Sequence, residues 1–339
     1  MGRTAAALRR VLVLDVAADS GGALSVLREY HERLSRDDAR DYVFCVGLPE
    51  LPEAGNIRVC RFPWVKKSWL HRLWFDHVTV QRLLRRERID AVFSLQNLAV
   101  SRTHLPQTVY LHQAIPFSDY RFRLLKDPRL WVVQHVIGRG ILASVRKASA
   151  VIVQTNWMKE AVCRRTGVPA EKIRVQPPLL PEQPPRRFRA ADWKRQFFYP
   201  AAAYSYKNHE LILRAMSRLA AQGITDYEML FTLREEELPQ VAAFPAIRKQ
   251  LRFLGPLPQE EVLRLYAETV LVFPSHIETL GLPLLEAALV GAPVLAADRP
   301  FSREILADRE DVGFFDPFDA ETLATGMRRL LSPEGMTSV

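Results

Sequence analysis

Short apolar runs rich in β-branched and aromatic residues alternate along the chain with longer segments in which apolar positions recur every three to four residues. The short runs have the length and composition of buried strands, and the longer segments have the periodicity of amphipathic helices. Strands that alternate with helices are typical of parallel, doubly wound α/β sheets. The predicted strands are RVLVLDVA (10–17), YVFCVGL (42–48), IDAVFSLQN (89–97), QTVYLHQ (107–113), ASAVIVQT (148–155), FFYPAAA (197–203), YEMLFTL (227–233), LRFLGP (251–256), TVLVFPS (269–275) and APVLAAD (292–298).

A proline-rich stretch interrupts this alternation near the middle of the chain. The segment VQPPLLPEQPPRRFR (175–189) contains five prolines. Proline has no N–H to donate and cannot continue a helix or a central strand, so the stretch predicts a linker. We therefore expect two Rossmann-like, doubly wound domains at residues 1–180 and 191–339, joined by a linker at 181–190. Ligands of such sheets bind beyond the carboxyl ends of the strands, so the domains are expected to face each other across a ligand-binding cleft.

Composition describes a globular chain of 339 residues with an uneven distribution of charge. Residues 1–180 carry 29 Lys and Arg against 16 Asp and Glu, a balance of +13, whereas the whole chain carries +9. A basic surface attracts the phosphate groups of nucleic acids, anionic lipids or anionic ligands. The alternative interpretation is a solvated surface in an arginine-rich protein, and composition alone does not separate the two.

Three features favour a reducing, cytoplasmic compartment for a chain that does not cross a membrane. The three cysteines, Cys45, Cys60 and Cys163, lack the spacing of a metal site or a disulfide framework. The apolar N-terminal stretch is interrupted by Asp15 and Asp19. No run approaches the roughly 18 apolar residues that a membrane-spanning helix needs.

The stretch HIETLGLPLLEA (276–287) is predicted to contain the start of a helix that follows the strand 269–275. Pro283 suits the first helical turn, where its missing N–H would have had no partner. Backbone N–H groups without partners, together with the helix dipole, attract anions to such a position. The residues that would supply them are Thr279, Leu280, Gly281 and Leu282.

Two glutamates, Glu278 and Glu286, flank this predicted anion site. Carboxylates repel a diphosphate, so they are expected to accept hydrogen bonds from hydroxyl groups on either side of it. Such charge-assisted bonds contribute roughly 1.5–3 kcal/mol each. A ligand with hydroxyls on both sides of a diphosphate is a nucleotide sugar. The alternative is that one glutamate is a loop charge and the other a charge on a helix surface.

The longer segment FPSHIETLGLPLLEAALVGAPVLAAD (273–298) resembles the E-x7-E signature of the family 4 retaining glycosyltransferases, whose GT-B fold consists of two Rossmann-like domains. Six further segments are similar to the family and occur in its order. They are GGALSVLREY, VYLHQAIPF, AVIVQTNWMKEAV, YSYKNHELILRAM, LRFLGPLPQEEVLRLYAETVLVFPS and REILADREDVGFFDPFDAETLA. The resemblance covers nearly the whole chain and implies a transferase that uses a nucleotide-diphosphate sugar.

The resemblance implies three catalytic residues. Glu278 would hold hydroxyls of the donor sugar and stabilise positive charge that develops at the anomeric carbon. Lys207 would bind the diphosphate and offset the charge that builds on the leaving group. His112 would lie beneath the sugar in the first domain. Without the resemblance, a lone lysine is usually solvated and a histidine after a strand is usually structural.

Donor-binding positions are implied in the same way. Glu286 would bind the ribose, while Gly21 and Gly22 would bring the backbone close to the phosphates or the sugar. Considered alone, a glycine pair indicates only a turn. Backbone groups at the end of the predicted strand 251–256 would accept the nucleotide base, at Phe253, Leu254 and Gly255.

Two departures from the family pattern affect the prediction of the donor. Many members carry an arginine five residues before the phosphate-binding lysine, where this chain has Ala202; Arg234 is a candidate replacement. Thr279 and Leu280 also replace the commoner Gly-Phe after the first glutamate. Neither change removes the predicted site, but the donor base and sugar do not follow from it.

No metal or other cofactor is expected. The sequence contains no D-x-D triplet and no His/Cys cluster at ligand spacing, whereas metal-dependent transfer needs carboxylates that hold a divalent cation on the diphosphate. The resemblance implies transfer with retention of anomeric configuration on the front face of the sugar, with the departing phosphate helping to deprotonate the acceptor.

The acceptor is expected to meet the basic first domain. The segment WVKKSWLHRLWFDHVTVQRLLRRER (64–88) combines three tryptophans with several lysines and arginines. It is either an ordinary domain helix or an interfacial helix on anionic lipid. The second interpretation predicts peripheral contact at the inner face of the cytoplasmic membrane, a glycan or lipid-linked acceptor, and a role in bacterial surface polysaccharide or lipopolysaccharide assembly. One helical face is predicted to contain Trp69, Leu70, Leu73, Trp74 and Leu84.

Other protein classes make different predictions. A GT-B nucleotide-sugar epimerase would convert the donor without an acceptor, and a glycoside phosphorylase would need free phosphate. A non-catalytic GT-B partner subunit would not need the full set of site residues. Nucleic-acid binding is disfavoured because the chain has no aromatic-basic RNA signature and no recognition-helix module. An NAD-dependent dehydrogenase is disfavoured because DSGGAL (19–24) lacks the G-x-G-x-x-G spacing.

Overall fold

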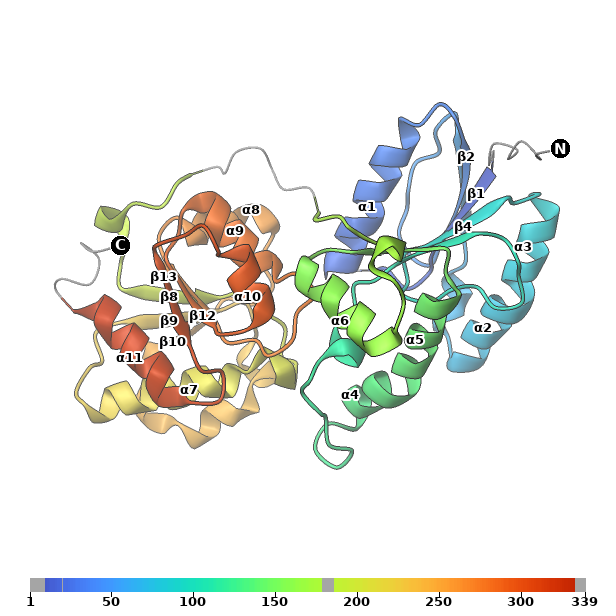
Figure 1. Ribbon diagram of the computed structural model, residues 1–339. Helices are drawn as coiled ribbons and strands as arrows, with labels where there is room; N and C mark the ends of the chain where they lie inside the picture. The colour runs from blue at the N-terminus through green and yellow to red at the C-terminus, as the bar shows by residue number, and fades with distance from the viewer. Residues whose placement is uncertain (1–9, 20, 179–185, 333–339) are drawn as a thin grey trace. The chain divides into compact units, whose positions relative to one another are not determined.

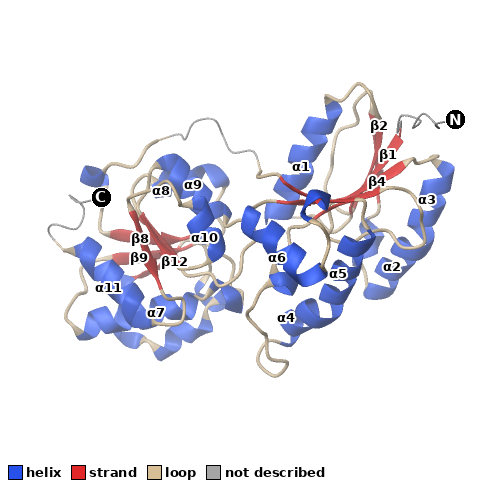
Figure 2. Cartoon of the chain, viewed as in Figure 1, coloured by secondary structure: helices blue, strands red, loops and turns tan. Residues whose placement is uncertain are grey.

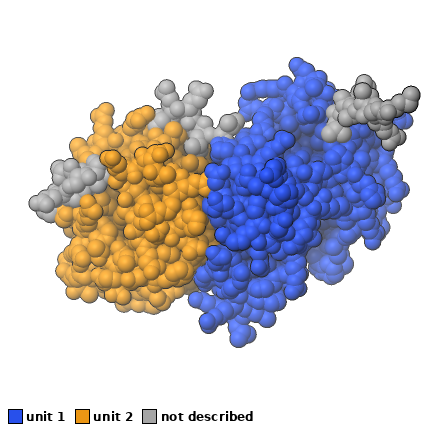
Figure 3. All heavy atoms as spheres, viewed as in Figure 1, with its two compact units in different colours: residues 1–179 blue, residues 180–339 orange. Residues whose placement is uncertain are grey.

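The computed structural model describes residues 10–19, 21–178 and 186–332. The chain divides into two compact units, unit 1 (Met1–Leu179) and unit 2 (Leu180–Val339), which Figure 3 distinguishes by colour. Residues 181–185 of the predicted linker lie outside the described residues. Its remaining part is held by unit 2, because Arg186 forms ion pairs with Asp192 (2.8 Å) and Glu268 (2.6 Å).

Unit 1 contains a parallel sheet of seven strands in the order β3-β2-β1-β4-β5-β6-β7. The chain leaves β1 in one direction for β2 and β3 and later returns to β1's other side as β4, so the strand order reverses between β1 and β4. This reversal is the topological switch point of a doubly wound sheet. The strands are β1 (Arg10–Asp15), β2 (Asp41–Val46), β3 (Ile57–Arg61), β4 (Ala91–Ser94), β5 (Gln107–Tyr110), β6 (Ala150–Val153) and β7 (Ile173–Val175).

Helices cover both faces of this sheet, as the layers in Figure 2 show. Strand β1 alternates its side chains between two cores, with Val11 and Val13 in one and Leu12 and Leu14 in the other. Burial on both faces explains why its sequence is a continuous apolar run. The helices of unit 1 are α1 (Gly21–Ser35), η1 (Pro63–Lys66), α2 (Trp69–Trp74), η2 (Phe75–Thr79), α3 (Val80–Arg86), η3 (Ile115–Phe117), α4 (Pro128–Val132), η4 (Val133–Ile137), α5 (Gly138–Lys147), α6 (Asn156–Thr166) and η5 (Ala170–Lys172).

One prediction for the segment 64–88 is wrong. Leu84 is buried in the core of unit 1, whereas the other members of its predicted helical face are exposed. The cause is η2, a turn of π-helix between α2 and α3. A π-turn contains one residue more than an α-turn, so it rotates α3 relative to α2 and changes which positions share a face. The exposed members are Trp69, Leu70, Leu73 and Trp74.

Unit 2 contains a parallel sheet of six strands in the order β10-β9-β8-β11-β12-β13, which repeats the strand order of unit 1. Its switch point lies between β8 and β11, which pair directly. The prediction of two doubly wound parallel sheets is therefore confirmed. The strands are β8 (Gln196–Tyr199), β9 (Glu228–Phe231), β10 (Leu251–Phe253), β11 (Val270–Phe273), β12 (Val294–Ala297) and β13 (Val312–Phe315).

The helices of unit 2 include the predicted helix after β11, labelled α9 in Figure 1. Gly281 precedes it with φ 80°, Pro283 lies in its first turn, and Gly291 ends it with φ 79°. Both glycines have left-handed backbone conformations that other residues adopt at a cost. No described helix combines the length and apolarity needed to span a bilayer. The helices are η6 (Ala190–Asp192), η7 (Ser205–Lys207), α7 (His209–Ala221), η8 (Glu235–Glu237), η9 (Pro239–Ala243), η10 (Pro245–Gln250), α8 (Gln259–Tyr266), α9 (Leu282–Val290), α10 (Pro300–Ile305) and α11 (Ala320–Leu331).

Candidate active site

Lys207 and Glu278 meet at the switch point of unit 2. Lys207 ends η7 in the loop after β8, and Glu278 lies in the loop after β11. Because β8 and β11 are neighbours, the loops at their carboxyl ends converge. The Lys207 Nζ donates to the Glu278 Oε1 over 2.5 Å, and only 16% and 14% of these side chains are exposed. Two of the predicted catalytic residues are therefore in direct contact.

Further contacts fix this ion pair in place. The buried Ser275 Oγ donates to the same Glu278 Oε1 over 2.6 Å. The Lys207 Nζ lies 5.6 Å from the centre of the Tyr206 ring, a distance at which a cation is attracted to the π face. The hydroxyl of Tyr199, whose pKa is raised by burial, donates to the Lys207 carbonyl over 2.9 Å. The sequence did not identify Ser275, Tyr206 or Tyr199 as site residues.

Asn208 connects the loops that form this site. Its side-chain N–H groups donate to the Pro274 carbonyl (3.2 Å) and the Pro317 carbonyl (2.9 Å), which follow β11 and β13. Its backbone has φ 60°, a left-handed conformation that asparagine tolerates better than most residues. The dipeptide Lys207-Asn208 before a helix was the available signal, because asparagine is common where a turn must enter this conformation.

The start of α9 presents unpaired N–H groups beside Glu278. Among the described residues, the backbone N–H groups of Leu280, Gly281 and Leu282 form no hydrogen bond. The N–H of Leu284 is satisfied by the Gly281 carbonyl over 2.8 Å. Three unpaired donors at a helix N-terminus, near the ammonium of Lys207, favour binding of an anion. Thr279, also predicted for this site, lies half-buried in the same loop.

Glu286 lies inside α9 and has different partners. Its side chain is buried, with the Gln259 Nε2 donating to its Oε1 over 3.1 Å and the Tyr266 hydroxyl to its Oε2 over 3.3 Å. Burial raises the pKa of this carboxyl, and the two hydrogen bonds oppose that effect. Within the described residues, no hydrogen bond or ion pair joins Glu286 to Lys207 or Glu278. The sequence did not identify Gln259 or Tyr266.

The predicted base-binding positions lie at the end of β10. The N–H of Leu254 donates to the Phe231 carbonyl over 2.9 Å, and the N–H of Gly255 donates to the Leu233 carbonyl over 3.1 Å. These two N–H groups are therefore occupied by bonds within unit 2. The Phe253 ring packs against Phe231 at 5.8 Å.

Two cations are candidates for the role of the arginine that Ala202 replaces. Arg234 follows β9, is exposed and forms no ion pair with a described residue. Arg299 precedes α10, and its buried Nε has no hydrogen-bond partner among the described residues. Burial, followed by the charge of Arg299, lowers the pKa of His276 in the β11 loop to about 4. Arg299 therefore acts electrostatically on the loop that carries Glu278.

His112 lies at the corresponding edge of unit 1, two residues after β5. Its backbone N–H donates to the Asn97 Oδ1 over 2.8 Å. Its Nδ1 is buried and has no hydrogen-bond partner within the described part of the chain. Burial lowers the pKa of His112 to about 4, so its imidazole is neutral at neutral pH. Among the described residues, no hydrogen bond joins His112 to another of the predicted site residues.

The glycine pair begins α1 after the loop that follows β1. Gly21 has φ 58°, and both glycines are exposed. Apart from chain neighbours and the backbone of α1 itself, no atom of the described residues lies within 4 Å of the position that a Cβ would take at either residue. At the end of β1, Asp15 is 1% exposed; its Oδ1 accepts from the Ala18 N–H over 3.2 Å, and its Oδ2 has no partner among the described residues. Burial raises the pKa of Asp15 to about 7.

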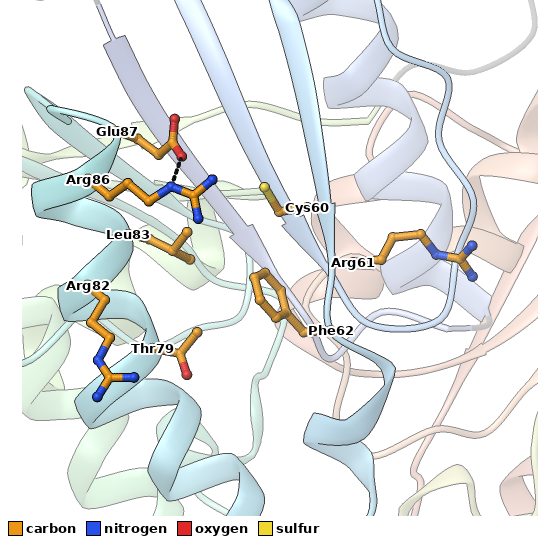
Figure 4. A pocket seen from close by; sticks show the side chains of 8 residues that line it. All are labelled: Cys60, Arg61, Phe62, Thr79, Arg82, Leu83, Arg86 and Glu87. Carbon is orange, nitrogen blue, oxygen red and sulfur yellow. Dashed lines mark ion pairs between the residues drawn. The ribbon is translucent and has the colours of Figure 1, made fainter.

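Figure 4 shows a separate pocket of about 380 Å³ in unit 1. It lies between β3 and α3, and none of the predicted site residues line it. Arg82 and Arg86 lie beside the apolar side chains of Phe62 and Leu83, and the Arg86 Nε pairs with the Glu87 Oε1 over 3.2 Å. Within the described ranges, no three His, Cys, Asp or Glu side chains gather in a way that could hold a metal ion.

Two family models match the chain, one for each unit. The model described as Glycosyltransferase Family 4 matches residues 20–181. The model described as Glycosyl transferases group 1 matches residues 183–338. The two matches are consecutive and together extend over nearly the whole sequence.

The curated relatives are distant in sequence. O-antigen chain mannosyltransferase B of Escherichia coli is 22% identical over 217 residues, 59% of this chain and 56% of that protein. O-antigen chain mannosyltransferase RfbU of Salmonella typhimurium is 26% identical over 219 residues, 62% of this chain and 58% of that protein. The chain thus spans less than two thirds of the length of these relatives.

Solved structures resemble the fold over almost its full length. Sucrose-phosphate synthase from Thermosynechococcus elongatus has a TM-score of 0.72 at 16% identity, covering 97% of this chain and 91% of that one. WaaG, a glycosyltransferase involved in lipopolysaccharide biosynthesis, has a TM-score of 0.68 at 14% identity, with coverages of 97% and 92%. Anabaena HepE in complex with UDP-glucose has a TM-score of 0.66 at 14% identity, with coverages of 97% and 91%. With matching family models on both units and this fold, the chain belongs to glycosyltransferase family 4 and has the GT-B fold.

Proposed function

We propose that the protein is a retaining glycosyltransferase that moves a sugar from a nucleotide-diphosphate sugar to a glycan or glycolipid acceptor in bacterial surface polysaccharide or lipopolysaccharide assembly. One observation carries the proposal. At the switch point of unit 2, the ammonium of Lys207 and three unpaired N–H groups lie beside a carboxylate, Glu278, that is held by Ser275. Cation and N–H groups suit a diphosphate, and the carboxylate suits the hydroxyls of the attached sugar.

Donor binding requires the ion pair between Lys207 and Glu278 to rearrange. A diphosphate would take the ammonium of Lys207 as a partner, while Ser275 continues to hold the Glu278 carboxylate. Glu278 is then available to accept hydrogen bonds from the sugar, each worth roughly 1.5–3 kcal/mol. The complex of HepE with UDP-glucose supports a nucleotide sugar as the class of donor.

The proposed reaction balances without a metal or other cofactor. The bond between the anomeric carbon and the phosphate oxygen breaks, the acceptor oxygen bonds to the anomeric carbon on the same face, and the acceptor proton passes to the departing phosphate. Lys207 and the N–H groups of α9 offset the charge on the leaving group, the role of preorganised donors in such sites. Glu278 stabilises positive charge at the anomeric carbon. We assign His112 to the donor sugar on the strength of the family resemblance, as a neutral hydrogen-bonding group.

Glu286 and Arg299 complete the assignment in unit 2. Gln259 is exposed and can release its hydrogen bond to the Glu286 Oε1. Glu286 then accepts hydrogen bonds from the ribose. Tyr266 is buried and keeps the other oxygen in position. Arg299 supplies the cation that Ala202 lacks, because its Nε is unpaired and its charge already acts on the loop after β11.

A thermal-shift panel of UDP-, GDP-, dTDP- and ADP-sugars tests the donor site. One nucleotide class is expected to raise the melting temperature, because a ligand that binds only the folded state stabilises it. Lys207→Ala is expected to abolish the shift. Lys194→Ala is the matched control, since Lys194 is an exposed lysine of unit 2 whose partner is Glu268. Silence across the panel would favour a non-catalytic partner subunit, and conversion of the donor without an acceptor would favour an epimerase.

Peripheral contact with an anionic membrane is part of the proposal. Trp69 is 70% exposed and Trp74 is 56% exposed on α2, together with Leu70 and Leu73. Apolar patches rimmed by cations are typical of interfacial helices. This contact would bring the protein to a lipid-linked acceptor. Flotation with anionic vesicles at low salt tests it, and loss of flotation in Trp69→Ser/Trp74→Ser is the expected result.

A further inference from the structure

A second exposed apolar site lies in unit 1, in the loop before α4, which projects from the unit in Figure 1. We name residues 120–127 the basic loop. Its tip consists of Leu124, 51% exposed, and Leu125, 100% exposed. The two leucines lie between Arg123 and Lys126. Because Leu125 is fully exposed, its side chain has no role in the packing of the described chain. Large apolar side chains in that position indicate a surface that is covered by something else.

The basic loop is held in shape by buried groups. Phe122 is 3% exposed, and its N–H donates to the Oε1 of buried Gln134 in η4 over 3.1 Å. The Gln134 Nε2 donates back to the Tyr120 carbonyl over 2.7 Å. At the tip, the N–H groups of Lys126 and Asp127 both donate to the Arg123 carbonyl, over 3.1 and 2.9 Å. These bonds form a turn that keeps the two leucines pointing away from the core.

Cations surround the base of the tip. A pocket of about 270 Å³ is lined by Tyr120, Arg121, Arg123, Lys126 and Asp127. The Arg121 Nη1 donates to the Ser118 carbonyl over 2.6 Å, which fixes the position of its guanidinium. Three cations and a phenol around one hollow match the oxygens of a phosphate group, while the single carboxylate of Asp127 leaves the pocket positive.

The apolar surface continues from the loop along the next helix. Exposed positions on η4 are Val136 at 55% and Ile137 at 44%, and Val132 on α4 is 40% exposed. Exposed Arg129 and Arg139 flank them. Between residues 119 and 140 the sequence contains five Lys and Arg against two Asp. An apolar strip with cations at its borders is complementary to the headgroup region of an anionic bilayer.

We propose that the basic loop is a bilayer-binding element, in which the pocket binds the phosphate of an anionic phospholipid and Leu124 and Leu125 enter the interface. This inference deepens the membrane contact proposed above, because it assigns the headgroup contact to a second segment that lies outside residues 64–88. The fixed turn positions the leucines before binding, so little ordering is required when the bilayer is reached.

Flotation of the full chain with two kinds of vesicle tests the inference. Vesicles of phosphatidylcholine with phosphatidylglycerol are compared with vesicles of phosphatidylcholine alone, and neither contains donor or acceptor. Arg123→Gln/Lys126→Gln is expected to lower the partition constant for anionic vesicles about 25-fold, since each cation near an anionic surface contributes about fivefold. Leu124→Ser/Leu125→Ser is expected to lower it at least about tenfold through lost apolar burial.

Matched controls separate local contact from general charge. Arg164→Gln/Arg165→Gln removes two exposed cations from α6, and Leu48→Ser removes a leucine that is 47% exposed. Both controls are expected to float like the unchanged protein. Donor-induced thermal shifts are expected to persist in every loop variant, so failure of this inference is distinguishable from failure of the donor site.

The outcomes that overturn the inference are specific. The loop variants could float like the unchanged protein while Trp69→Ser/Trp74→Ser does not. That result would show that α2 alone contacts the bilayer. Equal flotation with both kinds of vesicle would show that the pocket does not bind the phosphate of an anionic phospholipid. No flotation with anionic vesicles would remove both membrane contacts.

Discussion

The two units have the same strand order but differ sharply at their switch points. In unit 2, the loops after β8 and β11 are joined by the Lys207–Glu278 ion pair, with Ser275 on the same carboxylate and Asn208 connecting the loops. In unit 1, Asp15 at the end of β1 has an oxygen without a partner among the described residues, while Asp19 in the following loop pairs with Lys66. The buried carboxylate of unit 1 therefore has an oxygen without a partner among the described residues, whereas the carboxylate of unit 2 is bonded to a cation and a hydroxyl.

This difference shows that the sheet provides the location of a site but not its chemistry. Adjacent strands bring two loops together in both units, and the loop residues decide whether charges compensate each other. A compensated ion pair is stable without ligand and must exchange partners when the donor binds. Burial instead shifts the pKa of Asp15 and of His112, each of which has one side-chain atom without a partner among the described residues.

The largest effect is expected from removing the charge of Glu278. Glu278→Gln keeps the size of the side chain but removes the negative charge that partners Lys207 and that, in the proposed reaction, stabilises the anomeric carbon. We expect sugar transfer to fall about 100- to 1,000-fold, as when one preorganised electrostatic group is lost from an active site. The measurement is the turnover number with the donor identified by thermal shift.

Glu260→Gln is the control for that change. Glu260 is an exposed glutamate of unit 2 that pairs with Arg264 one helical turn away. Its replacement is expected to leave turnover within about twofold, because exposed ion pairs contribute little. Glu278→Gln with unchanged turnover would exclude this carboxylate from the reaction and leave Lys207 without its proposed counterpart.

A smaller effect, in stability, is expected from Asp15 in unit 1. Its folded pKa is about 7 against an ordinary value of 3.8, so between these values the folded state binds a proton that the unfolded state has released. Stability therefore falls as pH rises through this window. From pH 5 to pH 8 the loss is about 2–3 kcal/mol. Asp15→Asn is expected to remove this dependence and to be the more stable protein at pH 8.

Denaturant unfolding of Asp15→Asn and the unchanged chain at both pH values checks this. The transition of unit 1 is the one to follow, because two units need not unfold together. If both proteins lose stability equally between pH 5 and pH 8, the Asp15 carboxyl is ionised throughout and the contrast between the switch points is smaller than the structure indicates.

The sequence predicted the two sheets well because central parallel strands are buried on both faces. It did not predict β3, β7 or β13, which lie at the edges of the sheets. Edge strands are partly exposed, and the arginines in IRVCR (57–61) and IRV (173–175) interrupt the apolar runs that identified the others. The arginines therefore account for two of the three missed strands, whereas the edge strand β10 was predicted from LRFLGP (251–256).

The candidate site residues also fall into two groups, those that lie in recognisable motifs and those that no local pattern marks. Lys207, Glu278 and the glycines lie in motifs with a recognisable order, so a resemblance could identify them. Ser275 and Tyr266 act through hydrogen bonds between segments far apart in sequence, and no local pattern marks such bonds. The basic loop was missed because Leu124 and Leu125 look like core residues until their exposure is known.

The smallest effect is expected from the glycine pair, and it separates a ligand contact from a simple turn. Gly22→Ala places a methyl group where, apart from chain neighbours and the backbone of its own helix, no described atom lies within 4 Å, at a position without positive φ. Alanine is also the better helix former by roughly 0.5–1 kcal/mol, so the variant is expected to be as stable as the unchanged chain or more so. Gly21→Ala is expected to destabilise by about 1–2 kcal/mol, because φ 58° is costly for alanine.

If the backbone at Gly22 approaches the donor, Gly22→Ala is expected to bind the donor poorly even though it is the more stable of the two variants. The added methyl of Gly22→Ala would meet the ligand alone, so the Michaelis constant for the donor is expected to rise about tenfold, equivalent to about 1.4 kcal/mol, with little change in turnover. A variant that is stable yet binds the donor poorly is the signature of a close approach between backbone and ligand. Unchanged donor affinity in Gly22→Ala would leave the pair as a turn.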